Sequence, residues 1–173
     1  LIHSNAIRIL LPTANASPPP WFSRMHPESR HVDKHGLRYK PGSRQHYCPN
    51  SAAYRHAASA LVTKLAQRYG KHPAVLMWHV NNEYACHTFE CYCDTCRDQF
   101  RAWLQERYTT LDVLNEAWGT HFWSQGYGQW DEIELPNRTI TFVNPGQMLD
   151  YRRFMNDSIL SLFRSEIEAI RTA

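Results

Sequence analysis

Apolar residues recur along this chain in short runs and in helical stripes, a pattern that predicts strands alternating with helices. Two short apolar runs, residues 7–11 and 75–80, predict buried strands. Between them, Asn50 or Ser51 can cap a helix that ends at Gly70. The order strand, loop, helix, strand is the repeating unit of a parallel α/β sheet or barrel.

Further helices are predicted in the second half of the chain. A short helix over residues 111–118 stops at Gly119, and Asn144 with Pro145 opens a last long helix. Each long helix carries an apolar stripe that we expect to be buried. The stripes of the first helix, of the helix near residue 100 and of the last helix are Ala53, Ala57, Ala60, Leu61 and Leu65; Phe100, Trp103, Leu104 and Tyr108; and Tyr151, Met155, Leu162 and Phe163.

Segments without periodicity connect these elements. Four prolines stiffen the loop over residues 12–20 and exclude regular structure from it. Trp21 and Phe22 follow the prolines and either anchor the loop to the core or line a binding site; the sequence leaves both open. Residues 23–50 form a long excursion, and excursions of that length in a compact domain are usually functional. Residues 120–143 are a second aperiodic stretch, rich in aromatic residues.

Composition narrows the class of protein only moderately. The 173 residues are 43% apolar and 13% aromatic, which fits a globular domain with a real core. The net charge of +3 comes without a block of like charges, so we expect no nucleic-acid partner. No apolar run approaches the roughly 20 residues that span a membrane, and no signal peptide is visible, so we expect no membrane contact and a cytoplasmic location. Both ends fall in helical patterns, and we expect residues 1–173 to be a single partial domain of a longer protein.

The first candidate site lies where the second apolar run ends, at Asn81, Asn82 and Glu83. Sites in parallel α/β folds lie at the C-terminal ends of strands, because the loops there converge on one face. A carboxyl group at such a position can carry a proton, and an amide beside it can bind a hydroxyl. A salt bridge at the strand end is the structural alternative, and the local pattern does not decide between the two.

Cysteines form the second candidate site, since four of the five lie within residues 86–96. Cys91 and Cys93 are too close in sequence to form an easy mutual disulfide. The spacing from Cys93 to Cys96 is common in zinc knuckles. We therefore favour a structural metal over a disulfide framework.

The segment that carries both candidate sites, residues 78–108, reads WHVNNEYACHTFECYCDTCRDQFRAWLQERY. It resembles the β-galactosidases of glycoside hydrolase family 42. The resemblance continues, in the order of the family, through PTANASPPPWF, GSRQHYCPNSAAYR, LNEAWGTHFWSQGY and NPGQMLDYRRFMNDS. It spans nearly the whole chain, which makes the match specific.

The resemblance implies an α/β fold that is part of a (β/α)8 TIM barrel, about strands three and four with their helices and long loops. It implies a retaining hydrolysis of terminal β-galactosides, with Glu83 as the general acid/base. Asn82 would bind the 2-hydroxyl of the sugar, and Arg44 would bind the galactosyl unit. The expected partner is thus a small galactoside, and the family suggests a homo-oligomer, usually a trimer.

Retaining glycosidases need a second carboxyl group about 5–5.5 Å from the acid. In the family this nucleophile follows a later strand, outside residues 1–173, and we expect the chain alone to be inactive. Glu132 and Glu134 lie in the second aperiodic stretch, whereas Glu166 and Glu168 are expected on the solvent face of the last helix.

The resemblance also implies a structural zinc ion held by four thiolates, because three clustered cysteines leave a tetrahedral ion one ligand short. The ligands would be Cys48, Cys91, Cys93 and Cys96. Cys86 and His87 compete for the fourth position, but the place of Cys86 beside Glu83 favours a buried thiol.

Two other functions are compatible with parts of the sequence. A small zinc-knuckle binding module would present its helix to nucleic acid or protein, but such a module should be ringed with basic residues. The acidic residues of segment 83–98 outnumber the single Arg97, and they are Glu83, Glu90, Asp94 and Asp98. A non-catalytic remnant of a glycosidase is the other alternative.

Overall fold

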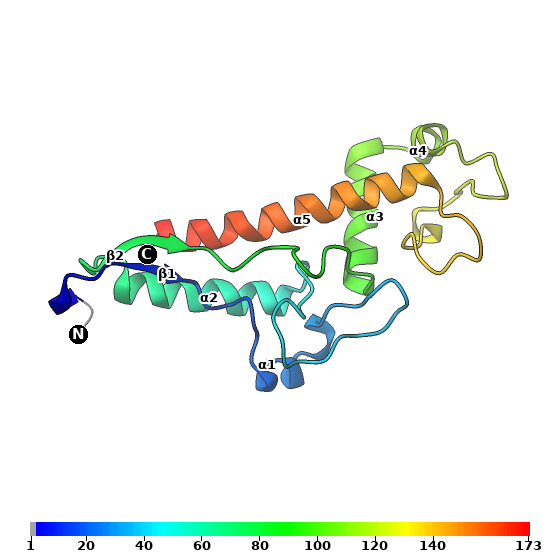
Figure 1. Ribbon diagram of the computed structural model, residues 1–173. Helices are drawn as coiled ribbons and strands as arrows, with labels where there is room; N and C mark the ends of the chain where they lie inside the picture. Colours follow the sequence, from blue (N-terminus) through cyan, green and yellow to red (C-terminus); the bar gives the residue numbers. More distant parts are fainter. Residues whose placement is uncertain (1–2) are drawn as a thin grey trace.

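The computed structural model describes residues 3–173 and has an elongated shape (Figure 1). Two strands lie at one end beside the long helices α2 and α5, and α3 and α4 lie at the other end. The strands are β1 (Ile9–Pro12) and β2 (Val75–His79), and the α-helices are α1 (Pro20–Met25), α2 (Ala52–Tyr69), α3 (Asp94–Tyr108), α4 (Leu111–Trp118) and α5 (Pro145–Arg171). Short 3₁₀ turns occur at His3–Asn5, Pro27–Ser29 and Trp130–Glu132. The predicted α/β order is confirmed.

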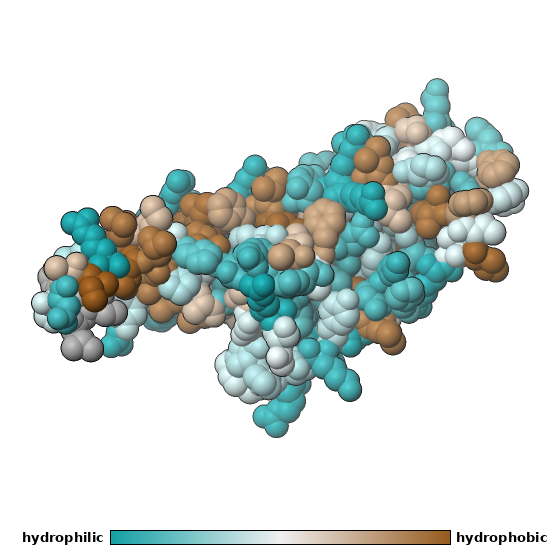
Figure 2. All heavy atoms as spheres, in the orientation of Figure 1, coloured by the Kyte–Doolittle hydropathy of each residue, from teal (hydrophilic) through white to brown (hydrophobic). Residues whose placement is uncertain are grey.

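The two strands pair in parallel, with Leu10 beside Met77. Their burial was predicted wrongly, because Leu10, Leu76 and Met77 are each more than half exposed. Each strand has a neighbour on one side only within the part of the chain that the structure describes. Hydrophobic surface therefore gathers at this end of the molecule (Figure 2).

Helix α2 begins as predicted, since the Ser51 hydroxyl accepts a hydrogen bond from the Tyr54 N–H. Its predicted stripe is wrong by one position. The buried residues are Tyr54, Ala58, Val62 and Ala66, whereas Leu61 is exposed. Packing of α2 along α5 decides which face is covered, and the ring of Tyr54 stacks on Tyr47 with centroids 3.8 Å apart. The core side of α2 thus carries an aromatic residue, a valine and two alanines in place of the expected alanines and leucines.

Helix α5 also begins where predicted. The Asn144 side chain accepts hydrogen bonds from the N–H groups of Gly146 and Gln147, and Pro145 is the first helical residue. Of its expected stripe, Tyr151, Met155 and Leu162 are buried, but Phe163 is exposed and Phe154 takes its place in the core.

The main core lies where α3, α4 and α5 meet. Phe100 and Leu104 are fully buried, as predicted, and Trp103 and Tyr108 pack against them partly exposed. Helix α4 ends at Gly119, whose left-handed conformation (φ 61°) satisfies two carbonyl groups of the last turn. Four cysteines also belong to this core, which fixes the loop before α3 to the helices, and they are Cys48, Cys91, Cys93 and Cys96.

The proline-rich loop ends in α1, where the two aromatic residues that follow the prolines differ in burial. Phe22 is buried in a second cluster with Tyr47, Tyr54 and Leu162, and it anchors the loop to the core. Trp21 remains 59% exposed. No helix within residues 3–173 is both long and apolar enough to span a bilayer. The cytoplasmic location expected from the sequence stays a prediction.

The uncovered sheet face should make residues 1–173, expressed alone, associate with themselves. Replacing the cross-strand neighbours by an opposite-charge pair, Leu10→Lys with Met77→Glu, should shift the chain towards monomer in sedimentation velocity. The matched control is Ile140→Lys with Phe142→Glu, which introduces the same charges at two loop residues that are 102% and 77% exposed. An equal shift in the control would mean that charge, and not the sheet face, governs association.

Candidate functional site

The segment after β2 carries an unusual backbone. Asn81, Glu83 and Ala85 all have positive φ values, of 56°, 51° and 60°. Such values are uncommon for residues other than glycine, and three of them within five residues mark this segment as a candidate for a functional role. Because every second residue has a positive φ, the chain turns sharply, and the Cys86 N–H donates to the Glu83 carbonyl at 3.0 Å.

Glu83 meets an arginine from the excursion before α2. Its carboxylate lies 2.7 Å from the Arg44 guanidinium, which also contacts the His87 ring at 2.9 Å. Both side chains of the ion pair are substantially exposed, at 38% for Arg44 and 53% for Glu83. The salt bridge that the sequence allowed is thus present, and its partner is the arginine that the motif singled out. Surface pairs of this kind contribute little to stability, so other contacts must position them.

Gln45 supplies several of those contacts. It is buried, and its side-chain amide donates to the carbonyls of Asn82, at 3.0 Å, and of Glu83. Its side-chain oxygen accepts from the His87 N–H at 3.0 Å. The sequence analysis did not identify this residue, although its place next to Arg44 in the motif was the available signal. Gln45 holds the backbone on both sides of the acidic residue.

Asn81 links the ends of both strands. Its N–H donates to the Thr13 hydroxyl and its side-chain oxygen accepts from the Asn82 N–H, both at 2.7 Å. Its side-chain amide donates to Glu166 at 3.3 Å. The prediction that Glu166 faces solvent is wrong, since this residue is fully buried. Glu166 lies four residues after Leu162, on the buried stripe of α5, and that spacing was the signal for its position.

The candidate acid and sugar-binding residues are therefore brought together in part. Arg44 touches Glu83 directly, and Asn82 is adjacent in the chain and half-buried. The other candidate carboxyl groups are engaged elsewhere: Glu132 accepts from the backbone of Gly128 and Gln129, and Glu134 pairs with an arginine of α3.

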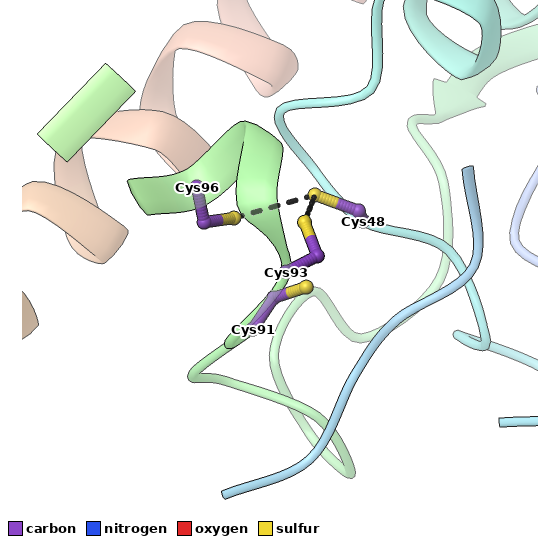
Figure 3. A group of neighbouring side chains, drawn as sticks. All are labelled: Cys48, Cys91, Cys93 and Cys96. Atoms are coloured by element: carbon purple, nitrogen blue, oxygen red, sulfur yellow. Dashed lines mark hydrogen bonds between the residues drawn. The ribbon is translucent and has the colours of Figure 1, made fainter. Parts of the chain in front are cut away.

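The four clustered cysteines form one compact group (Figure 3). Cys91 and Cys93 precede α3, Cys96 lies in its first turn, and Cys48 comes from the excursion before α2. Their sulfur atoms all lie within 4.8 Å of one another, with Cys48 at 3.4 Å from Cys96 and 3.6 Å from Cys93. All four are buried and none is in a disulfide. The structure thus brings together the predicted metal-ligand residues.

The surroundings of this group suit thiolates that bind a metal. Sulfur atoms at about 2.3 Å from a tetrahedral zinc ion are about 3.8 Å apart, close to the observed separations. Backbone N–H groups of Val32 and Asn50 donate to the sulfurs of Cys91 and Cys48 at 3.5 and 3.4 Å, and the Asn50 side chain donates to Cys96 at 3.4 Å. Donors in this position stabilise sulfur that carries negative charge.

Four thiols this close cannot all ionise by themselves. Hydrogen bonds from Cys48 and its neighbours lower the pKa of Cys93, whereas hydrogen bonding to Cys91 and the other thiols, followed by burial, raises the pKa of Cys48 well above its ordinary value. A divalent cation would remove this conflict, because it stabilises every thiolate at once.

Cys86 stands apart from this group and is exposed, so the expectation of a buried thiol is wrong. The turn after Glu83 directs the chain outwards at this point. His87 also lies outside the group, since its ring contacts Arg44. Neither competitor takes the place of Cys48.

Comparisons with known proteins identify the family of the whole chain. A family model described as Beta-galactosidase, glycoside hydrolase family 42, matches residues 1–173. The beta-galactosidase LacZ of Heyndrickxia coagulans is 54% identical over 172 residues, which cover 99% of this chain and 26% of the relative. The beta-galactosidase BgaB of a Geobacillus species is 52% identical over 171 residues, covering 99% of this chain and 25% of that relative.

Solved structures give the same result. The crystal structure of beta-galactosidase from the psychrophilic Marinomonas ef1 superposes with a TM-score of 0.96 at 41% identity, covering 99% of this chain and 26% of that one. The Halorubrum lacusprofundi beta-galactosidase gives 0.95 at 43% identity, with the same coverage. These matches place the chain among the glycoside hydrolases, and it belongs to glycoside hydrolase family 42. It spans about a quarter of the length of the curated relatives that it matches.

Exposure separates the five thiols chemically. In the folded chain, Cys86 should react rapidly with a bulky disulfide reagent, and the four buried thiols only after denaturation. We expect about one fast equivalent per chain, absent in Cys86→Ser. A fast phase that survives this substitution would contradict the burial of the cluster.

Proposed function

We propose that this chain is the acid-bearing part of a retaining β-galactosidase, with Glu83 as the general acid/base. The observation that carries the proposal is the meeting of Glu83, Asn82 and Arg44 at the end of a parallel strand, in a chain of family 42. Glu83 would protonate the departing glycosidic oxygen and then, as a carboxylate, take a proton from the attacking water.

Arg44 and Asn82 would bind the sugar. Arg44 already uses its guanidinium on Glu83 and His87, so a galactosyl hydroxyl would compete for the same hydrogen bonds. Substrate binding would then exchange the ion pair for contacts with sugar. The Asn82 amide would bind the 2-hydroxyl, where a hydrogen bond can strengthen in the transition state.

We place β1 and β2 at about strands three and four of a (β/α)8 barrel. Their parallel pairing, the helix between them and the position of the site after β2 all support this placement. The nucleophile would then follow a later strand. The substrate would be a small galactoside, and the trimer that the family suggests stays a prediction.

The complete enzyme that contains this chain tests the proposal through Glu83→Gln. This variant keeps the shape of the side chain but cannot donate the proton, so hydrolysis of lactose should fall by at least about 10²-fold. Release of a strongly acidic leaving group, such as dinitrophenolate, should be far less affected because it needs little protonation. Cleavage of lactose at the wild-type rate would exclude Glu83 as the acid.

We also propose that Cys48, Cys91, Cys93 and Cys96 bind one structural zinc ion. The buried thiols, their spacing and the N–H donors around them support a closed site without an open position for substrate. Such an ion would fasten the excursion before α2 to the loop after β2. Burial of the cluster in the main core also argues against a zinc-knuckle module that presents a free helix to a partner.

Metal analysis of the purified enzyme tests the zinc site. About one zinc ion per chain is expected in the wild type and in Cys86→Ser, and none in Cys48→Ser. The Cys48→Ser variant should also lose thermal stability, because metal binding contributes directly to the free energy of folding. Retention of zinc without Cys48 would refute the four-ligand assignment.

A further inference from the structure

Glu166 is a carboxyl group buried completely beneath the candidate active site. It lies on α5, and its two oxygens face the ends of both strands. One oxygen accepts from the Asn81 side-chain amide at 3.3 Å, and the other lies 3.2 Å from the Thr13 hydroxyl. Among residues 3–173, no arginine, lysine or histidine pairs with it. The second buried carboxyl group in this part of the chain, Asp150, has two arginine partners.

Phenol groups complete the surroundings of Glu166. The Tyr84 hydroxyl is buried without a hydrogen-bond partner in the part of the chain that the structure describes. Burial, and after it the charge of Glu166, raises the pKa of Tyr84. The Tyr54 hydroxyl lies 3.5 Å from the same Asn81 amide. A buried carboxyl group without a cation is costly for the fold, so its position needs a reason beyond packing.

The contacts of Asn81 connect Glu166 to the catalytic carboxyl. Glu166 fixes the Asn81 amide, which leaves the amide oxygen facing the backbone N–H of Asn82. The Thr13 hydroxyl holds the backbone N–H of Asn81 from the other strand. These three bonds hold Asn81, which has a left-handed backbone (φ 56°), at the point where the chain leaves towards Glu83.

We infer that Glu166 is a positioning residue of the hydrolytic reaction: it orients Asn81 and thereby holds Asn82 and Glu83 in the geometry that proton transfer requires. Glu166 touches neither substrate nor the reacting atoms and acts only through Asn81. The inference rests on the proposed function for its effect on catalysis, but the orientation of residues 81–83 can be measured without activity.

The test uses the complete enzyme with Glu166→Gln, and Glu168→Gln as matched control. Glutamine keeps the volume and one acceptor oxygen, so the fold should survive, but its NH₂ group replaces one of the two acceptors. Glu168 lies on the same helix and is exposed. A misplaced acid should lower kcat for lactose about 10- to 100-fold, with a much smaller change for dinitrophenyl galactoside and little change in KM. The control should behave as the wild type.

Hydrogen exchange of the peptide over residues 80–86 gives the second readout. The backbone N–H groups of Asn81 and Asn82 should exchange faster in Glu166→Gln than in Glu168→Gln, at an unchanged melting temperature. Equal exchange in the two variants, or an equal loss of kcat for both substrates, would overturn the positioning role. If the wild type hydrolyses no galactoside, the proposed function fails, whereas the exchange comparison still decides whether Glu166 orients residues 81–83.

Discussion

The candidate site depends on the contacts that join two segments, the excursion before α2 and the loop after β2. Gln45 binds the backbone of Asn82 and Glu83 just after β2, and Cys48 contacts the cysteines at the start of α3. Arg44 and Glu83 are far apart in sequence, and they meet because these two sets of contacts fix both segments.

Buried contacts, and not the ion pair itself, hold this arrangement. An exposed pair such as Arg44 and Glu83 contributes about 0–1 kcal/mol. A hydrogen bond from a buried group contributes about 0.5–1.5 kcal/mol, and leaving such a group unpaired costs about 1–3 kcal/mol. Gln45 and Asn81 are both buried and make several such bonds. The exposed carboxyl can therefore interact with solvent or ligand while its backbone stays fixed.

Local features of the fold were predictable from sequence, because their causes are local. The caps at Ser51 and Asn144, the stop at Gly119 and the order of strands and helices all follow from short-range chemistry. Spacing alone pointed to Cys91, Cys93 and Cys96 as members of the cysteine group, whereas Cys48 was predictable only from the family motif.

The errors share a different cause, which is packing between distant elements. The covered face of α2 is set by α5, and the exposure of Leu10 and Met77 by the absence of further strands among the described residues. Glu166 was assigned to solvent because charged residues on helices usually are exposed. Its spacing of four residues from Leu162 places it on the buried face of α5 instead.

The backbone between the strand end and the cysteines shows why residues without a chemical role matter here. Three non-glycine residues with positive φ cost about 1–3 kcal/mol each where the conformation is strained. Such a turn persists only where the surroundings over-determine it, and Thr13, Gln45 and Glu166 are the side chains that do so. They come from the end of β1, the excursion and α5, three segments that converge only in the folded chain. The position of the Glu83 carboxyl is thus a property of the tertiary structure, although the residue itself can be picked out in the sequence.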